Sequence, residues 1–334
     1  MKGSAIRLGR ALLSYFLFLF LCVLLVGCDV LPGNGSPTRA ARIRIASSAA
    51  LLPLISAAVA LFERQHPEER IAVQHYESVD GLNRLADQQV GIAATTLYVD
   101  PSVAHLRDAL FGVVPYLIVV QHDAPLASLS QAQIQRIFST GQITDWQQIG
   151  GPEQKVVVVL PPLTSDTQYL FREEMLGSAA EVGNVLPTDS LETLRDMVAR
   201  TPGSISYLPA PLSNSEVHTV AIDGERATAE QIASGHYSFW SFAHLYTRDS
   251  STPGTGEIML FLQFMQSSEV AQLALQLGYI SLSEMNAAPV STSLVAHTTE
   301  ALKARFVACA VPHIVYCVGY LSGYAWLQDS WLLV

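Results

Sequence analysis

The chain has 334 residues, of which 50% are hydrophobic and 14% are charged, and its formal net charge is −10. The length fits two domains of ordinary size, and the hydrophobic content excludes an intrinsically disordered chain. The acidic balance and the lack of a basic block argue against nucleic-acid binding, because phosphate backbones are bound by clustered lysines and arginines.

Residues 1–28 are predicted to be a lipoprotein signal peptide. A lysine and two arginines precede an uncharged apolar run over residues 11–26. Such a run is too short to span a membrane as a helix, which takes about 20 residues, and is typical of a signal-peptide core. The run ends in a motif that resembles the bacterial lipobox, so we predict that Cys28 is lipidated. A plain secretory signal or a short anchor with a coincidental cysteine is the alternative.

Residues 29–42 are rich in glycine and proline, which predicts a flexible tether. The body of the chain, residues 43–300, has no cysteine, so neither a disulfide nor a thiolate metal site is expected there. The 9 histidines are scattered without the spacing of metal ligands. These features predict an extracytoplasmic protein, lipid-anchored to the cell membrane, with no metal ion and no cofactor.

Strands and helices alternate in the first part of the body. In chain order we predict a strand at 43–46, a helix at 50–62, a strand at 71–75, a loop at 77–81, a helix at 81–88, and strands at 90–94 and 111–120. This order predicts a parallel sheet with helices on both faces.

The second part continues as a mixture of strands and helices. We predict helices at 131–138, 168–176, 189–200, 257–266 and 269–277, and strands at 155–160, 204–208, 217–222 and 238–246. Ser130 is placed to cap the first of these helices, because serine hydroxyls accept hydrogen bonds from free helical N–H groups.

The segment at 129–151 resembles the hallmark segment of the phosphate-binding proteins of ABC transporters. Four further segments match that family in the same chain order, namely 111–120, 204–208, 237–246 and 278–282. The resemblance covers residues 43–287. It implies an α/β, two-lobed periplasmic-binding-protein type II fold, in which each lobe is a mainly parallel sheet flanked by helices and the ligand lies in a cleft between them.

The resemblance also implies where the chain crosses between the lobes. Lobe 1 would consist of residues 43–118 plus 245–287, and lobe 2 of residues 123–235. The matching loops imply five ligand-binding hydroxyls, those of Ser48, Ser78, Thr95, Ser165 and Thr167. Hydroxyls and helix N-termini suit an anion, because both offer hydrogen-bond donors. Serine and threonine also cap helices without any ligand, which is the alternative for each of them.

The chain departs from the family at four positions around this site. Pro161 stands where the family has an arginine, and Gly91 stands where it has an aspartate. Glu77 and Asp166 add candidate cleft acids, which either face the ligand or turn outward to solvent. A like charge at 4 Å costs on the order of 4 kcal/mol at an effective dielectric constant of 20, so tight binding of a dianion is not expected.

The implied function is a lipid-anchored solute-binding receptor that delivers phosphate or a related oxyanion to the membrane permease of an ABC importer. The alternatives are the same fold with a changed ligand, and a signalling or scaffold lipoprotein without a transport role. No enzyme is predicted, because no catalytic set of residues occurs at a known spacing.

The tail at 288–334 does not match the family. Its stretch at 306–328 has no charged residue and is long enough to span a membrane. Three interpretations stay open: a segment packed on the body, a membrane-associated segment, and non-native sequence from a change of reading frame.

Overall fold

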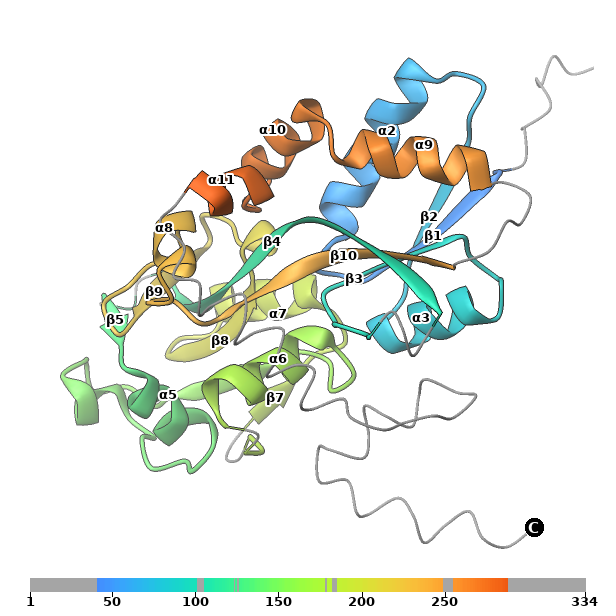
Figure 1. Ribbon diagram of the computed structural model, residues 1–334. Helices are drawn as coiled ribbons and strands as arrows, with labels where there is room; N and C mark the ends of the chain where they lie inside the picture. Colours follow the sequence, from blue (N-terminus) through green and yellow to red (C-terminus); the bar gives the residue numbers. More distant parts are fainter. Residues whose placement is uncertain are drawn as a thin grey trace, which may run out of the picture. The chain divides into compact units, whose positions relative to one another are not determined.

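The computed structural model describes residues 41–100, 105–122, 124, 126–177, 179–181, 185–248 and 255–287 (Figure 1). The predicted signal peptide with its lipidated cysteine, nearly all of the tether, and the tail lie outside these residues. Within the described ranges, no helix has both the length and the apolar character that crossing a membrane requires.

The first group of strands is parallel. β1 (Ile43–Ser47) lies between β2 (Ile71–His75) and β3 (Ile92–Thr95), with parallel pairing on both sides. Two helices connect them: α2 (Leu52–Gln65) follows β1, and α3 (Ser78–Ala86) follows β2. In parallel strands the carboxyl ends meet at one edge of the sheet, so the segments that follow β1, β2 and β3 are brought together.

Two long strands connect this group to the rest of the molecule. β10 (Trp240–Arg248) pairs antiparallel with β3 and also with β4 (Leu106–Gln121). The second half of β4 then pairs with β8 (Ser204–Pro209) and with β9 (Val217–Ile222). Most residues of β4 are buried, which explains its nearly continuous hydrophobic run. The antiparallel pairs make the sheet mixed, where the sequence predicted a parallel one.

The second group of strands is again parallel, in the order β8-β6-β7. Its elements are β5 (Ser128–Leu129), α5 (Gln131–Phe138), η1 (Trp146–Ile149), β6 (Val157–Leu160), α6 (Asp166–Met175), β7 (Val185–Pro187), α7 (Leu191–Arg200), η2 (Ala210–Leu212) and α8 (Ala229–Ala233). The predicted cap of α5 is confirmed, since the Ser130 hydroxyl accepts a hydrogen bond from the Gln133 N–H.

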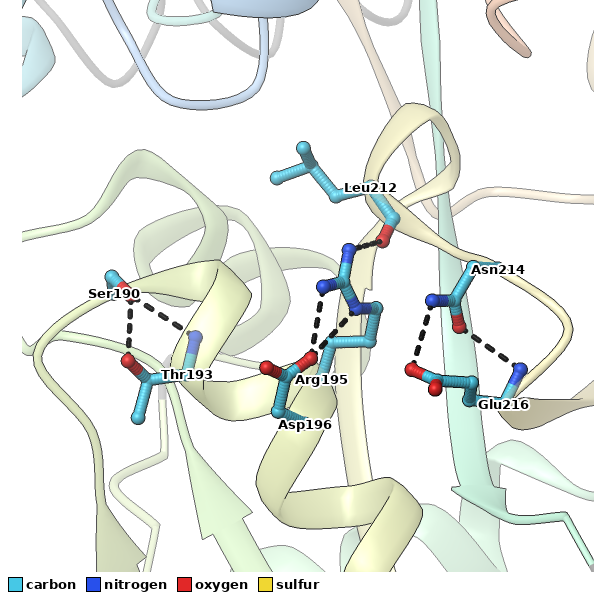
Figure 2. Close-up of polar contacts among 7 residues, drawn as sticks. All are labelled: Ser190, Thr193, Arg195, Asp196, Leu212, Asn214 and Glu216. Carbon is cyan, nitrogen blue, oxygen red and sulfur yellow. Dashed lines mark hydrogen bonds and ion pairs between the residues drawn. The ribbon is translucent and has the colours of Figure 1, made fainter.

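One polar contact links α7 to η2, the short helix that follows β8 (Figure 2). The Ser190 hydroxyl accepts from the Thr193 N–H at 3.0 Å and so caps the helix. Arg195 pairs with Asp196 at 2.8 Å and also donates to the Leu212 carbonyl at 3.5 Å. The apolar face of α7 packs on this part of the sheet.

Of the last three helices, the first two return to the first group of strands, and the third lies beside α8 (Figure 1). The three helices are α9 (Thr255–Met265), α10 (Ser268–Gln276) and α11 (Leu282–Ala287). Both α9 and α10 contact α2, and the rings of Phe62 and Phe261 meet edge to face at 5.4 Å. Segments from both ends of the body therefore share one core.

The fold is α/β, with a large sheet flanked by helices. Hydrogen-bonded strand pairs run without a break from β2 to β7 through β10 and β4. The proposed lobe boundaries stay a prediction.

One local prediction was wrong: residues 78–81 do not form a loop, because α3 begins at Ser78.

Candidate functional site

Polar side chains gather where the three parallel strands of the first group end. Ser48 follows β1, Ser78 begins the helix after β2, and Thr95 and Thr96 lie at the end of β3. All four side chains are buried. Hydroxyl groups from three successive loops are therefore held at one edge of the sheet and shielded from solvent.

Asp166 reaches this cluster from the other group of strands. It is the first residue of α6 and is only 3% exposed. Its Oδ2 atom accepts a hydrogen bond from the Ser78 hydroxyl at 2.9 Å and another from the Thr96 hydroxyl. Of the two orientations left open by the sequence, the structure has the inward one.

The hydroxyl of Thr96 is the end of a chain of donors. Ser241 donates to the Tyr116 hydroxyl at 3.4 Å, and Tyr116 donates to Thr96 at 3.2 Å. Burial raises the pKa of Tyr116 well above its ordinary value, and the nearby Asp166 carboxylate raises it further. The phenol therefore stays protonated, and each donor in the chain points toward the carboxylate.

Two of the predicted hydroxyls are buried without a partner. Ser48 is 1% exposed and Thr167 is 0% exposed. Neither the Ser48 Oγ nor the Thr167 Oγ1 has a hydrogen-bond partner among the described residues. A buried polar group without a hydrogen bond destabilises the folded protein by about 1–3 kcal/mol. A polar ligand that bonds to these two hydroxyls would therefore remove that penalty.

One of the predicted hydroxyls also caps a helix. Ser165 accepts from the Gln168 N–H at 3.2 Å and caps α6. The Thr95 hydroxyl also acts locally and accepts from the Leu97 N–H at 3.0 Å. By contrast, α2 and α3 have no side-chain cap, so neither Ser48 nor Ser78 serves that purpose.

Glu77 adds a second acid beside Asp166. It precedes α3 with an extended backbone, is half-buried, and does not cap the helix. Burial raises the pKa of Glu77 from its ordinary value of 4.5 to about 7, and the Asp166 carboxylate contributes to the rise. Two carboxyl groups thus influence one another at this edge.

Pro161 and Gly91, which stand where the family has an arginine and an aspartate, lie in different places relative to the polar cluster. Pro161 follows β6 and is buried, and it supplies no donor. Gly91 precedes β3, whereas Thr95 ends that strand. A Cβ atom at Gly91 would lie 2.9 Å from the Cδ1 atom of Ile258 on α9. Gly91 therefore lies at the other end of β3, and its lack of a carboxylate leaves the cluster unchanged.

The sequence analysis missed Thr96, Tyr116 and Ser241. Their roles depend on contacts between residues far apart in the chain, for example 70 residues for Thr96 and Asp166. The signal that was present is the threonine pair at the end of β3. In the part of the chain that the structure describes, no group of three or more histidine, cysteine or acidic residues could hold a metal ion.

A family model and a relative show the family of the chain. A family model described as a PBP superfamily domain matches residues 32–269. The phosphate-binding protein PstS of Bacillus subtilis (strain 168) is 30% identical over 258 residues, which cover 75% of this chain and 84% of that protein.

Solved structures share the fold at lower identity. A phosphate ABC transporter substrate-binding protein with bound phosphate, from Clostridium perfringens, is 21% identical with a TM-score of 0.67, over 72% of this chain and 99% of that one. An ABC-type phosphate transport receptor from Vibrio cholerae is 23% identical with a TM-score of 0.60, over 71% and 99%.

Proposed function

The chain belongs to the PBP superfamily, and on that premise we propose that it is the solute-binding receptor of an ABC importer and binds phosphate or a related oxyanion. Its relatives carry phosphate-binding and phosphate-transport names. The partners of such a receptor are a small inorganic oxyanion and a membrane permease. It performs no covalent chemistry, since its task is to bind and release.

One observation carries the proposal: among the described residues, two buried hydroxyls, Ser48 Oγ and Thr167 Oγ1, lack a hydrogen-bond partner. They belong to segments that already meet, because the neighbouring Asp166 accepts from Ser78 across the two groups of strands. An oxyanion offers several acceptor oxygens to such donors. We assign the ligand to Ser48, Ser78, Thr95, Ser165 and Thr167.

Two further parts of the proposal concern the ends and the motion of the molecule. The motif ending in Cys28 would place the receptor outside the cytoplasmic membrane on a lipid anchor. The two lobes, 43–118 plus 245–287 and 123–235, would close on the ligand by a hinge motion and open again at the permease.

Titration calorimetry with phosphate, arsenate and sulfate tests the proposal on the purified protein. We expect phosphate binding, and Ser48→Ala and Thr167→Val should each weaken it roughly two- to tenfold, since a neutral hydrogen bond contributes about 0.5–1.5 kcal/mol. An exposed hydroxyl changed in Thr140→Val is the control. Absence of binding to every oxyanion would reject the proposal and favour the scaffold alternative.

The two acids favour a second candidate, a receptor for a less charged solute. Glu77 and Asp166 lie at the site, and Pro161 replaces the guanidinium that would balance an anion's charge. Adding neutral and cationic solutes to the same titrations separates the candidates. Binding of such a solute, with none of phosphate, would establish the changed ligand.

A further inference from the structure

The Asp166 carboxylate already has the hydrogen bonds that an oxyanion would form. Its Oδ2 atom accepts from the Ser78 and Thr96 hydroxyls. Thr96 in turn accepts from Tyr116. The Ser78 and Thr96 hydroxyls, from the first group of strands, therefore already donate to a carboxylate from the second group.

The position of the carboxylate is fixed by the fold. Asp166 is the first residue of α6, where the Ser165 cap holds the backbone. Across from it, Ser78 is the first residue of α3, and that helix has no side-chain cap. A negative charge near the first turn of a helix is stabilised by the free N–H groups there. The carboxylate thus lies where an anion is favoured from two sides.

The hydroxyls beside it are not satisfied in the same way. Thr167 follows Asp166 in α6, and Ser48 follows strand β1, yet neither hydroxyl has a hydrogen-bond partner in the part of the chain that the structure describes. The Asp166 side chain therefore accepts from some of the donors in the cluster and, among the described residues, leaves the Ser48 and Thr167 hydroxyls without a hydrogen bond. The cluster is therefore partly occupied by the protein itself.

We propose that Asp166 is an intramolecular ligand of the site, whose carboxylate occupies Ser78 and Thr96 in competition with a bound oxyanion and so sets the affinity of the receptor. The inference rests on the proposed function and deepens it. An entering anion must displace the carboxylate from these hydroxyls, or accept a like charge beside it. Ligands that carry less negative charge, or that offer a proton to the carboxylate, are favoured.

Phosphate titrations at pH 8 on wild type, Asp166→Gly and Asp166→Asn test the inference. The glycine variant removes the competing group, and the asparagine variant keeps its shape and removes its charge. We expect Asp166→Gly to bind phosphate at least about tenfold more tightly than wild type, because both the competitor and the repulsion are gone. Asp166→Asn should also bind more tightly than wild type.

A matched control is Glu192→Gln, which removes an exposed acid from the first turn of α7 and should bind as wild type does. Thermal unfolding gives a second readout. Without ligand, Asp166→Gly should unfold at a lower temperature than wild type, and phosphate should raise its unfolding temperature by more than it raises that of wild type.

The outcomes separate this inference from the proposed function. Equal or weaker phosphate binding by Asp166→Gly, with binding by wild type, would overturn the inference and leave the receptor function intact. If wild type and both variants fail to bind any of phosphate, arsenate and sulfate, the receptor function fails and the inference fails with it.

Discussion

The hydroxyl of Ser78 donates to the carboxylate of Asp166 at 2.9 Å, although 88 residues separate them in the chain. The two residues begin the helices α3 and α6, which follow strands of different groups. This contact joins two of the segments that carry the candidate binding hydroxyls. It also places a negative charge in a site that we assign to an anion.

The support given to Asp166 by Thr96 can be measured as stability. Thr96→Val keeps the size of the side chain and removes the donor to the carboxylate. We expect a loss of about 1–3 kcal/mol in the free energy of unfolding, because a buried acceptor loses a partner. Urea denaturation measures the loss. The control is Thr219→Val on β9, a half-buried strand threonine, and an equal effect of both changes would contradict the role of Thr96.

Glu77 predicts a specific pH dependence of stability. Its pKa is raised from 4.5 to about 7 in the folded protein, so the folded state keeps a proton that the unfolded state loses. The contribution of Glu77 to the stability of the folded protein is therefore largest below pH 4.5. It falls between pH 4.5 and about 7, and it stays constant above about pH 7. Burial and the charge of Asp166 are the causes.

Chemical denaturation across this pH range checks the prediction. Glu77→Gln should be more stable than wild type at pH 8, and the difference should vanish near pH 4. An exposed acid, changed in Glu153→Gln, is the control for the loss of one charge. A difference between Glu77→Gln and wild type that stays constant over the range would show that Glu77 titrates normally.

Gly203 is expected to tolerate no side chain. Its φ is +75°, and an added Cβ would lie 2.2 Å from the Lys155 carbonyl oxygen. Its own carbonyl accepts from the Trp146 indole at 3.0 Å. Gly203→Ala should therefore cost clearly more than the roughly 1–2 kcal/mol of a left-handed backbone alone.

The matched control for this change is Gly224→Ala. Gly224 has a φ of +88° with nothing within 4 Å of an added Cβ, so its cost should come from the backbone alone. Urea denaturation of both variants gives the comparison. Equal losses would show that the contact at Gly203 relaxes without cost.

The predicted lipid anchor at Cys28 lies outside the described residues and is tested by mutation. Cys28→Ser removes the thiol that would receive the lipid, so the protein should leave the membrane fraction or stay unprocessed. Cell fractionation with immunoblotting and the mass of the mature protein provide the measurement. Cys22→Ser, within the apolar run, is the control. Wild-type maturation and fractionation of Cys28→Ser would show that the lipobox interpretation is wrong.

Local signals predicted much of the fold. The helix at 131–138 was predicted with its observed bounds, because the Ser130 cap is a property of adjacent residues. The start of α3 was missed, since Glu77 makes no side-chain cap that would mark it. The antiparallel position of β10 could not be read from a local pattern, because strand direction follows from where the chain returns to the sheet.

The five candidate hydroxyls came from the family resemblance, and their role in binding stays a prediction. Ser48, Ser78 and Thr167 are buried, whereas the partners of Asp166 come from distant segments. Whether a carboxylate faces inward depends on donors such as Thr96, which belong to another strand. Such a tertiary contact leaves no periodicity or spacing in the sequence.

A crystal structure of the wild-type protein grown in saturating phosphate tests the central claim most directly. We predict a tetrahedral anion within hydrogen-bonding distance, about 2.5–3.0 Å, of the Ser48 and Thr167 hydroxyls, with the Asp166 carboxylate moved away from Ser78. A structure in which Asp166 still accepts from Ser78, and no anion lies against Ser48 or Thr167, would contradict the assignment of this site to an oxyanion.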